Sequence, residues 1–344
     1  MRTTLLAIAL LLAACGGTAT PTGQLISSPV IPEDGGLSDG GVSDAGPAGA
    51  VDAGPVDAGP AAQASPSLGG CKMFPASSEW NRDISDDSVD PHSGSYVAFM
   101  GGGSLVLQPD FGGPFGQPFL VVPAGQARAP MSFLYNTQSE PGPYPFPQDV
   151  PIQNATDHHV TVLAQGECKL YETYQTKASG SGGFHADSGA VFDLTTGAAR
   201  PDGWTSATAA GLPILPGMAR YDEAGEQGEI LHALAFTAGD TAHSYVAPAT
   251  HSSGSTDAAF APPMGLRVRL KASYDLSKYT GESLAILKAL KKYGMFLTDT
   301  SGGQFWAVAG SLDSRWNSDN LEEIKTVPAS AFEVVKLPAL QAGQ

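Results

Sequence analysis

From residue 71 to residue 344 the sequence predicts one mainly β domain, a β-sandwich or barrel-like fold with one or two packing helices. Glycine and proline interrupt this region roughly every eight to fifteen residues, a spacing that favours many short strands. Its apolar runs are short and its aromatic residues are spread throughout. The length is ordinary for a single all-β domain.

The first fifteen residues predict export and lipid attachment. Arg2 precedes an apolar run over residues 5–12, which is much shorter than the roughly 20 residues of a membrane span. The sequence Leu-Ala-Ala-Cys that ends at Cys15 looks like a bacterial lipobox. We therefore expect a signal peptide over residues 1–14 and acylation of Cys15, including palmitate, which would make the membrane a partner through this anchor. An ordinary secretory signal is the alternative.

Residues 15–70 are expected to form a disordered tether behind the lipidated Cys15. They are rich in Gly, Ala, Pro, Asp and Ser, they lack aromatic residues, and they contain six acids without Lys or Arg. Such a segment buries too little apolar surface to fold. No Asp follows Cys15, which favours the outer membrane, so we expect a protein of the cell envelope with its domain exposed at the surface.

Charge and cysteine usage narrow the function classes. The chain has a net charge of −16, of which about −11 belongs to the domain once the tether and Arg2 are set aside, and this excludes nucleic acid as a partner. Nucleotide is also not expected, because the sequence has neither a P-loop nor a Rossmann glycine fingerprint. With Cys15 assigned to lipid, Cys71 and Cys168 predict a disulfide in an oxidising compartment, and two free thiols are the alternative.

The first structural element with chemical interest is a hairpin over residues 160–165 and 169–176. If Gly166-Glu167 forms its loop, Thr161 faces Glu172, and if the loop begins one residue earlier, His159 faces Glu172. In both registers His159 and Glu172 share one face of the sheet. An imidazole beside a carboxylate can act as a general acid–base pair or as half of a metal site, and an inert surface pair is the alternative.

Two further elements are predicted toward the C-terminus. Residues 266–272 alternate between apolar and basic side chains, which indicates a half-buried strand whose outer face carries Arg267, Arg269 and Lys271. Residues 281–292 form an amphipathic helix with Thr280 as its N-cap and Gly294 beyond its C-terminus.

Other polar side chains could join the hairpin pair. Asp193 is a carboxylate among apolar residues, which predicts a buried acid, although a turn cap is the alternative. His232 could equally be a hydrogen-bonded histidine of the core, and Asp157 precedes the hairpin. The candidate catalytic residues are His159, Glu172, Asp193, Asp222, His232 and His251. Possible sugar-stacking platforms, if they are not core residues, are Trp80, Trp204, Trp306, Trp316, Tyr144, Tyr171 and Tyr221.

The domain also resembles a widespread family of secreted bacterial and fungal proteins of unassigned activity, across nearly all of residues 71–335. The resemblance implies one exported domain that works near polysaccharide, because members are often joined to carbohydrate-binding or adhesive modules. It supplies no catalytic residues, and His185, in a segment that departs from the family, is left out of the site. The motifs that carry the resemblance are residues 80–85 (Trp-Asn-x-Asp-Ile-Ser), 108–112 (Gln-Pro-Asp-Phe-Gly), 140–145 (Glu-Pro-Gly-Pro-Tyr-Pro), 168–174 (Cys-Lys-Leu-Tyr-Glu-x-Tyr), 188–194 (Ser-Gly-Ala-Val-Phe-Asp-Leu), 200–206 (Arg-Pro-x-Gly-Trp-Thr-Ser), 211–214 (Gly-Leu-Pro-Ile), 216–217 (Pro-Gly), 220–223 (Arg-Tyr-Asp-Glu), 232–234 (His-Ala-Leu), 262–267 (Pro-Pro-Met-Gly-Leu-Arg) and 291–295 (Lys-Lys-Tyr-Gly-Met).

Three functions are therefore expected in order of preference. The first is an enzyme that acts on a polysaccharide as a glycoside hydrolase or lyase, without a cofactor, in which Glu172 or Asp193 is the general acid or nucleophile. The second is a non-catalytic carbohydrate-binding or adhesive protein that uses aromatic side chains and the basic face of residues 266–272. The third is a hydrolase that uses a divalent metal held by some of the same His and Asp residues.

Overall fold

The computed structural model describes residues 65–109, 111, 115–301 and 306–343. The predicted signal peptide, Cys15 and nearly all of the predicted tether lie outside these residues, so the expectations about them stay predictions. Within the described ranges, none of the helices combines the length and the hydrophobicity that crossing a bilayer requires.

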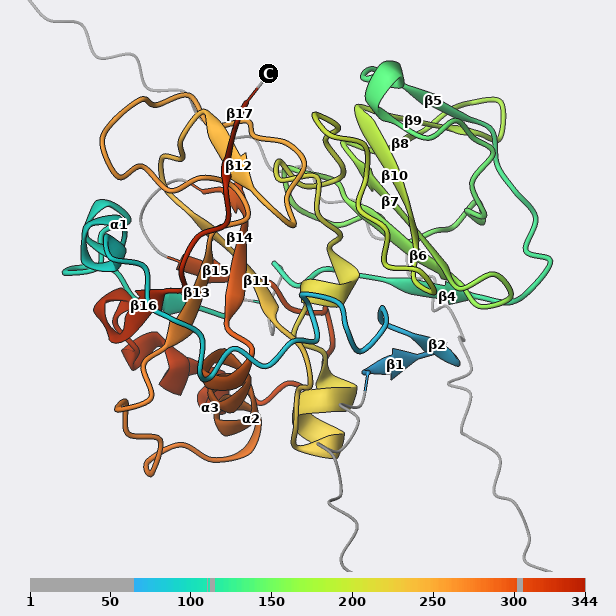
Figure 1. The fold of residues 1–344 in the computed structure, drawn as a ribbon. Helices are drawn as coiled ribbons and strands as arrows, with labels where there is room; N and C mark the ends of the chain where they lie inside the picture. The colour runs from blue at the N-terminus through green and yellow to red at the C-terminus, as the bar shows by residue number, and fades with distance from the viewer. Residues whose placement is uncertain (1–64, 110, 112–114, 302–305, 344) are drawn as a thin grey trace, which may run out of the picture. The chain divides into compact units, whose positions relative to one another are not determined.

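The described residues are mainly β, which confirms the predicted fold class (Figure 1). A six-stranded sheet has the strand order β16 (Phe332–Val334), β13 (Arg267–Leu270), β14 (Met295–Thr300), β11 (Leu234–Ala238), β15 (Trp306–Val308) and β3 (Leu107–Gln108). A four-stranded sheet has the order β10 (Ser188–Asp193), β7 (Lys169–Tyr174), β6 (Val160–Ala164) and β4 (Leu120–Val122). Smaller sheets pair β1 (Ser67–Leu68) with β2 (Cys71–Lys72), β12 (Ser244–Val246) with β17 (Leu340–Ala342), and β9 (Phe184–Ala186) with both β5 (Met131–Phe133) and β8 (Lys177–Ala178).

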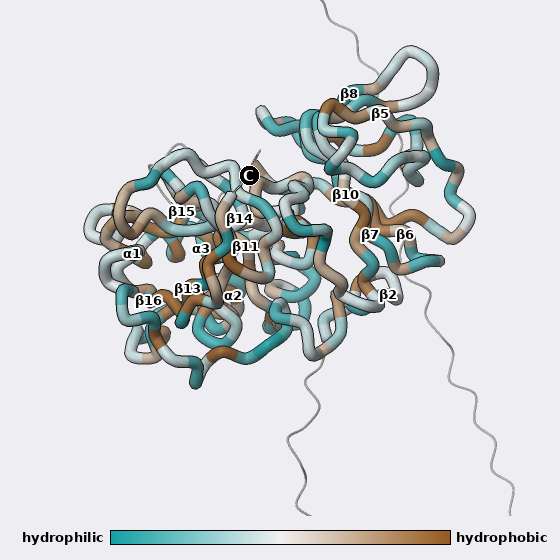
Figure 2. The backbone as a smooth tube through the Cα atoms, turned by 45° about the horizontal axis from the view of Figure 1, so that its top comes forward, coloured by the Kyte–Doolittle hydropathy of each residue, from teal (hydrophilic) through white to brown (hydrophobic). Residues whose placement is uncertain are grey.

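Both larger sheets mix parallel and antiparallel neighbours. β11 is parallel to β14, β15 to β3, and β4 to β6, whereas the remaining pairs in these two sheets are antiparallel. The two sheets share one hydrophobic core, in which Leu170 and Phe192 of the smaller sheet cluster with Phe236 and Leu297 of the larger one. Strands such as β7 and β10 accordingly carry hydrophobic stretches in Figure 2.

The predicted hairpin is present with one of its two expected registers. β6 and β7 are antiparallel, and Thr161 lies opposite Glu172. The connecting turn is closed by a hydrogen bond from the backbone N–H of Cys168 to the carbonyl oxygen of Gln165 at 3.4 Å. Gly166-Glu167 is therefore the loop, and His159 and Glu172 lie on the same face of the strand pair, as predicted.

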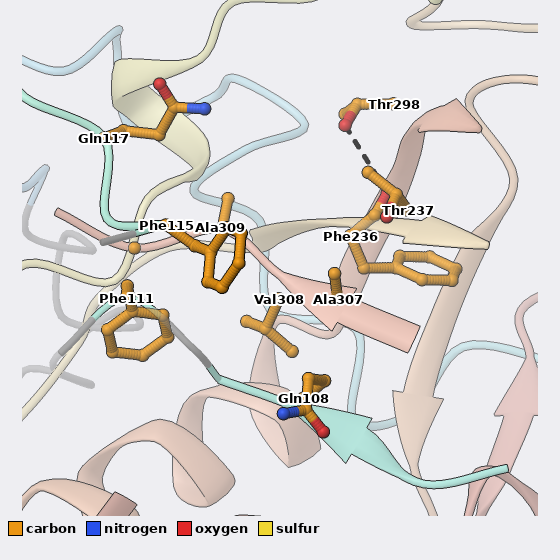
Figure 3. A pocket seen from close by; sticks show the side chains of 11 residues that line it. Gln108, Phe111, Phe115, Gln117, Phe236, Thr237, Thr298, Ala307, Val308 and Ala309 are labelled. Carbon is orange, nitrogen blue, oxygen red and sulfur yellow. Dashed lines mark hydrogen bonds between the residues drawn. The ribbon is translucent and has the colours of Figure 1, made fainter. Parts of the chain in front are cut away.

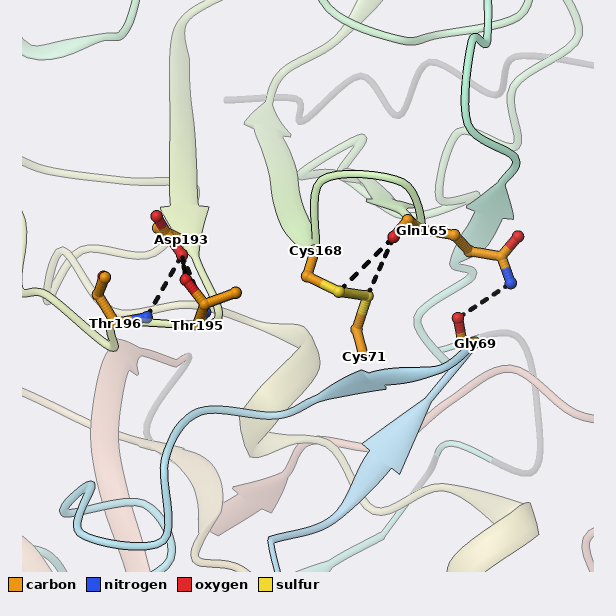
Figure 4. The surroundings of a disulfide bond; sticks show 7 residues. All are labelled: Gly69, Cys71, Gln165, Cys168, Asp193, Thr195 and Thr196. Atoms are coloured by element: carbon orange, nitrogen blue, oxygen red, sulfur yellow. Dashed lines mark hydrogen bonds between the residues drawn. A yellow bond between two sulfur atoms is a disulfide. The ribbon is translucent and has the colours of Figure 1, made fainter.

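The predicted disulfide is also present. Cys71 in β2 and Cys168 in the hairpin turn are joined across 97 residues of sequence (Figure 4). The side-chain amide of Gln165 donates to the carbonyl oxygen of Gly69 at 3.0 Å, which adds a second link between these segments. Closing a loop of this length stabilises the fold by about 4–5 kcal/mol on the chain-entropy model.

The long helix is where the sequence predicts it, but its N-terminus is capped differently. α2 spans Gly281–Lys292 and is followed by Gly294 with a φ of +66°. The Thr280 side chain makes no capping hydrogen bond, and instead the Asn320 Oδ1 of α3 (Ser318–Glu322) accepts from the Ser283 N–H at 2.8 Å. The remaining helical segments are short: α1 (Ser93–Phe99), the 3₁₀ segments Asn136–Gln138, Leu215–Gly217, Glu323–Thr326 and Ala329–Ala331, and the π-helical segment Asp222–Gln227.

The expectation of a basic outer face on β13 is wrong. Arg267 and Arg269 are 5% and 8% exposed, because other parts of the chain cover that face as well. The Arg267 guanidinium donates to the carbonyl oxygen of Tyr293 at 2.7 and 2.9 Å, and Arg269 forms an ion pair with Glu333 at 2.8 Å. Both side chains are therefore largely buried and hydrogen-bonded within the protein.

Candidate active-site cleft

A polar cleft of about 490 Å³ lies where loops from the two larger sheets meet. Asp157, Tyr174 and Ser188 come from the four-stranded sheet and its flanks, and Asp299 comes from the end of β14 in the other sheet. The remaining described lining residues are Tyr135, Gln138, Thr205, Ser206, Ala207, Thr208, Ala209, His251, Ser253 and Thr300. Hydroxyl, amide and carboxylate groups therefore dominate its wall.

Asp299 is placed by an irregularity in the strand pairing. The register of β11 against β14 shifts so that Thr237 lies opposite Asp299 and Thr298 is left unpaired in the ladder. Such a bulge redirects the side chains that follow it. The Asp299 Oδ2 accepts from the Ala209 N–H at 3.0 Å, and Oδ1 accepts from the Thr300 N–H at 2.8 Å.

The electrostatics of Asp299 suit a proton donor. Burial of its carboxyl group, assisted by the negative charge of Asp157, raises the pKa of Asp299 to about 6, although the two backbone N–H donors act in the opposite direction. The residue itself is only half-buried, since part of its surface faces the cleft. Asp299 is therefore an accessible acid that keeps its proton to a higher pH than an ordinary aspartate.

Asp157 supplies the second carboxylate. It lies in the turn before β6, where its backbone carbonyl accepts from the Gln175 N–H at 2.8 Å, so its position depends on the end of β7. The Thr156 hydroxyl donates to its Oδ1 at 3.3 Å. Burial, and then the charges of Asp157 and Asp299, raise the pKa of the Tyr174 phenol. These three side chains thus interact electrostatically across the cleft.

His251 is the one residue of the predicted catalytic set that lines the cleft. Its Nδ1 lies 2.7 Å from the carbonyl oxygen of Ala209, which can only accept, so Nδ1 carries the proton. In the neutral ring Nε2 is then an acceptor. Ala209 links His251 to Asp299, because its N–H donates to the carboxylate and its carbonyl accepts from the imidazole.

His159 and Glu172 lie outside the cleft lining. The His159 Nε2 donates to the carbonyl oxygen of Ala207 at 3.0 Å, so the ring supports the cleft wall from behind, and burial lowers the pKa of the imidazole. The fully buried Glu172 accepts from the N–H groups of Ile214 and Leu215 at 2.8 and 2.9 Å. Burial raises its pKa to about 7. The shared face was predicted correctly, but both side chains have structural partners.

Asp193 is a turn cap at the surface, so the expectation of a buried acid is wrong. Its Oδ1 accepts from the hydroxyl and the N–H of Thr195 at 2.6 and 2.9 Å (Figure 4). These hydrogen bonds lower the pKa of Asp193. The residue ends β10, and the apolar neighbours that suggested burial point to the other face or lie earlier in the strand.

Asp222 and His232 belong to a second polar cluster, in the interior. His232 donates from Nδ1 to the carbonyl oxygen of Ala233 at 2.8 Å and from Nε2 to Glu223 at 3.1 Å. Arg220 pairs with Glu223 at 2.8 Å and with Asp222 at 3.1 Å. Burial opposes ionisation of Glu223, but His232 and Arg220 outweigh it and lower the pKa of Glu223. His232 is therefore a hydrogen-bonded histidine of the core, which is the alternative that the sequence left open.

A smaller pocket of about 210 Å³ is lined mainly by apolar side chains such as Phe111, Phe236 and Val308 (Figure 3). None of its described lining residues carries a titratable side chain. Phe111 and Phe115 flank positions that the structure does not describe, so we build no site there. Across the described chain, no three His, Cys, Asp or Glu side chains converge as metal ligands.

Sequence reasoning noted Asp157 but missed Asp299 and Tyr174. One available signal was an acid two residues after the apolar run Met295–Leu297, since an acid at the end of a buried strand often faces a site. No family model matches the chain, and no curated protein and no solved structure matches it either. The family resemblance therefore depends on the sequence motifs alone.

Proposed function

We propose that this cleft hydrolyses glycosidic bonds, with Asp299 as the general acid and Asp157 as the base or nucleophile. The observation that carries the proposal is a pair of carboxylates in one cleft with unlike environments. Glycoside hydrolysis requires a protonated carboxyl group on the leaving oxygen and an ionised one that activates water or attacks the sugar.

The raised pKa of Asp299 supports this division of roles. Below about pH 6 Asp299 holds a proton that it can give to the departing sugar oxygen, while the charge of Asp157 favours that protonated state. If Asp157 is the nucleophile, the ionised Asp299 then takes a proton from the water that hydrolyses the glycosyl-enzyme. Both carboxylates act electrostatically on the Tyr174 phenol, which lines the same cleft.

The charge of the cleft favours hydrolysis over elimination. A lyase removes the proton next to a uronate carboxylate, and that step requires a cation to neutralise the substrate's negative charge. Of the described residues that line the cleft, none is Lys or Arg. Asp157 and Asp299 would repel a uronate, although the Nε2 of His251 could serve as the base.

The test is incubation of the purified full-length protein with a panel of neutral and acidic polysaccharides, with mass spectrometry of the products. We expect oligosaccharides of hydrolytic mass, and a loss of about 10²–10⁴-fold in rate for Asp299→Asn and Asp157→Asn. The matched control is Asp193→Asn, which removes an acid outside the cleft and should leave the rate unchanged. Products lighter by one water would show that the reaction is elimination and not hydrolysis. Full activity of both cleft variants would refute the site.

We also propose that the protein acts outside the cytoplasm, in the cell envelope, on a lipid anchor at Cys15. The Cys71–Cys168 disulfide supports this location, because such bonds persist in oxidising compartments. Metabolic labelling with a palmitate analogue should mark the wild-type protein and not Cys15→Ser. Equal labelling of the two would rule out acylation at Cys15.

A further inference from the structure

One aromatic residue faces the cleft without being part of the core. Tyr135 lines the cleft and is 49% exposed. Most of the aromatic side chains that the sequence suggested as sugar platforms are instead buried in the core: Trp80, Trp306, Trp316, Tyr144 and Tyr171. Tyr135 therefore combines the two properties that a stacking platform requires, an accessible ring and a place beside the proposed reacting groups.

The backbone around Tyr135 is held on both sides. Its N–H donates to the carbonyl oxygen of Asp187 at 2.8 Å. Its carbonyl accepts from the Gln138 N–H at 3.1 Å and from the Ser139 hydroxyl at 2.9 Å. Because these bonds fix the main chain, the ring can be presented with little loss of backbone entropy when a ligand binds.

The surroundings of Tyr135 indicate the class of ligand. A pyranose ring offers an apolar face of C–H groups to an aromatic ring and hydroxyl groups at its edge. The cleft that Tyr135 lines also holds accessible polar side chains, among them those of Gln138, Ser253 and Thr300. With two acids and no described Lys or Arg in the lining, the cleft disfavours an anionic sugar.

We propose that Tyr135 is the stacking platform of a subsite for an uncharged pyranose unit of a polysaccharide. The inference deepens the proposed function, on which it rests for the identity of the cleft. It requires only binding, so binding and cleavage can be tested separately.

The experiment uses full-length protein with Asp299→Asn, so that cleavage does not consume the ligand. Calorimetry would measure binding of four neutral hexasaccharides, of β-1,4-linked glucose, xylose, mannose and N-acetylglucosamine, and of hexagalacturonate as the anionic counterpart. We expect at least one neutral hexasaccharide to bind, and to bind more tightly than hexagalacturonate. Adding Tyr135→Ala should weaken that binding by about 5- to 10-fold, since an aromatic contact is worth roughly one kcal/mol.

Two variants control for the role of the ring. Tyr135→Phe retains the stacking face and should bind within about twofold of the parent. Leu134→Ala removes a neighbouring side chain that is 59% exposed but does not line the cleft, and it should leave binding unchanged.

Several outcomes would overturn the subsite. They are no binding of any neutral hexasaccharide, tighter binding of hexagalacturonate, or unchanged binding in Tyr135→Ala. Cleavage by the wild-type protein together with unchanged binding in Tyr135→Ala would refute the platform and keep hydrolysis. Binding that depends on Tyr135, without any cleavage, would refute hydrolysis and keep the platform.

Discussion

A carboxylate lies near an imidazole both in an interior cluster and at the cleft, and of these two parts of the described chain only the cleft is open to a ligand. In the interior, Glu223 contacts His232 directly and also pairs with Arg220. At the cleft, Asp299 and His251 contact each other only through the backbone of Ala209, and both side chains line an accessible space. Each region pairs an acid with a histidine, so what separates them is that Glu223 is buried against Arg220 whereas Asp299 opens to the cleft.

The pKa values of the Glu223 and Asp299 carboxyl groups are also shifted in opposite directions. The pKa of Glu223 is lowered by its cationic partners despite burial, so this group holds a fixed negative charge. The pKa of Asp299 is raised by burial and by a neighbouring acid, so this group exchanges a proton in the range where enzymes work. Glu223 is therefore held in a buried ion pair, whereas Asp299 combines a raised pKa with access from the cleft.

The largest expected loss of stability follows from breaking the interior cluster of Glu223, Arg220 and His232. Glu223→Ala leaves Arg220 and His232 buried without their shared anion, and it should lower the free energy of unfolding by about 3–5 kcal/mol. Denaturant unfolding of the full-length protein measures this change. The matched control is Glu226→Ala, which removes an exposed ion pair with Arg315 and should cost less than about 1 kcal/mol. Equal losses in the two variants would remove the distinction between the two regions.

The next effect concerns Glu172, a buried acid without a cationic partner in direct contact. Its pKa is about 7 in the folded protein, against a reference value of 4.5, so the folded state binds the proton more tightly than the unfolded chain. Stability from this group should therefore fall as pH rises from about 4.5 to 7, by roughly 2–3 kcal/mol between pH 5 and pH 8. Glu172→Gln cannot ionise, so the stability difference between wild type and this variant should change by that amount. A difference that stays constant with pH would contradict the raised pKa.

A third, smaller effect is the pH dependence of the proposed reaction. Because Asp299 must be protonated to act as an acid, kcat/KM should fall above about pH 6, by about tenfold per pH unit. The profile is measured on whichever polysaccharide the protein cleaves. A rate that rises through pH 6 to 8 would instead assign the important proton to a group that acts as a base.

The smallest effect is expected at Asp193, which tests the assignment of a turn cap. Asp193→Ala removes the acceptor of the two Thr195 hydrogen bonds and should cost about 1 kcal/mol or less. The catalytic rate of the folded protein should not change. A large loss of rate with little loss of stability would move Asp193 back into the site.

The sequence was most informative where structure depends on neighbours along the chain. Strand alternation and a two-residue loop limited the β6–β7 hairpin to two registers, one of which is present, and α2 followed from its periodicity and from Gly294. The disulfide followed from counting the cysteines of a chain that is expected to be exported. Each of these inferences needs only local geometry or composition.

The rest depends on contacts between distant segments. Asp157 and Asp299 share a cleft because the two larger sheets meet, and no local pattern encodes that meeting. Similarly, an alternating strand predicts one solvent-facing side, whereas in β13 a distant segment covers the side that bears Arg267 and Arg269. Burial on the second face of a strand is a tertiary property, so the sequence pattern could not reveal it.

The Cys71–Cys168 bond has a consequence for mechanical load. When the chain is pulled between its two ends, tension that enters at Cys71 passes through the sulfur atoms to Cys168 and continues from there. The loop of residues 72–167 is bypassed and carries none of this tension. Tyr135 and Asp157 both lie in that loop, so a pull on the two ends of the chain would leave the covalent path through this wall of the cleft unloaded.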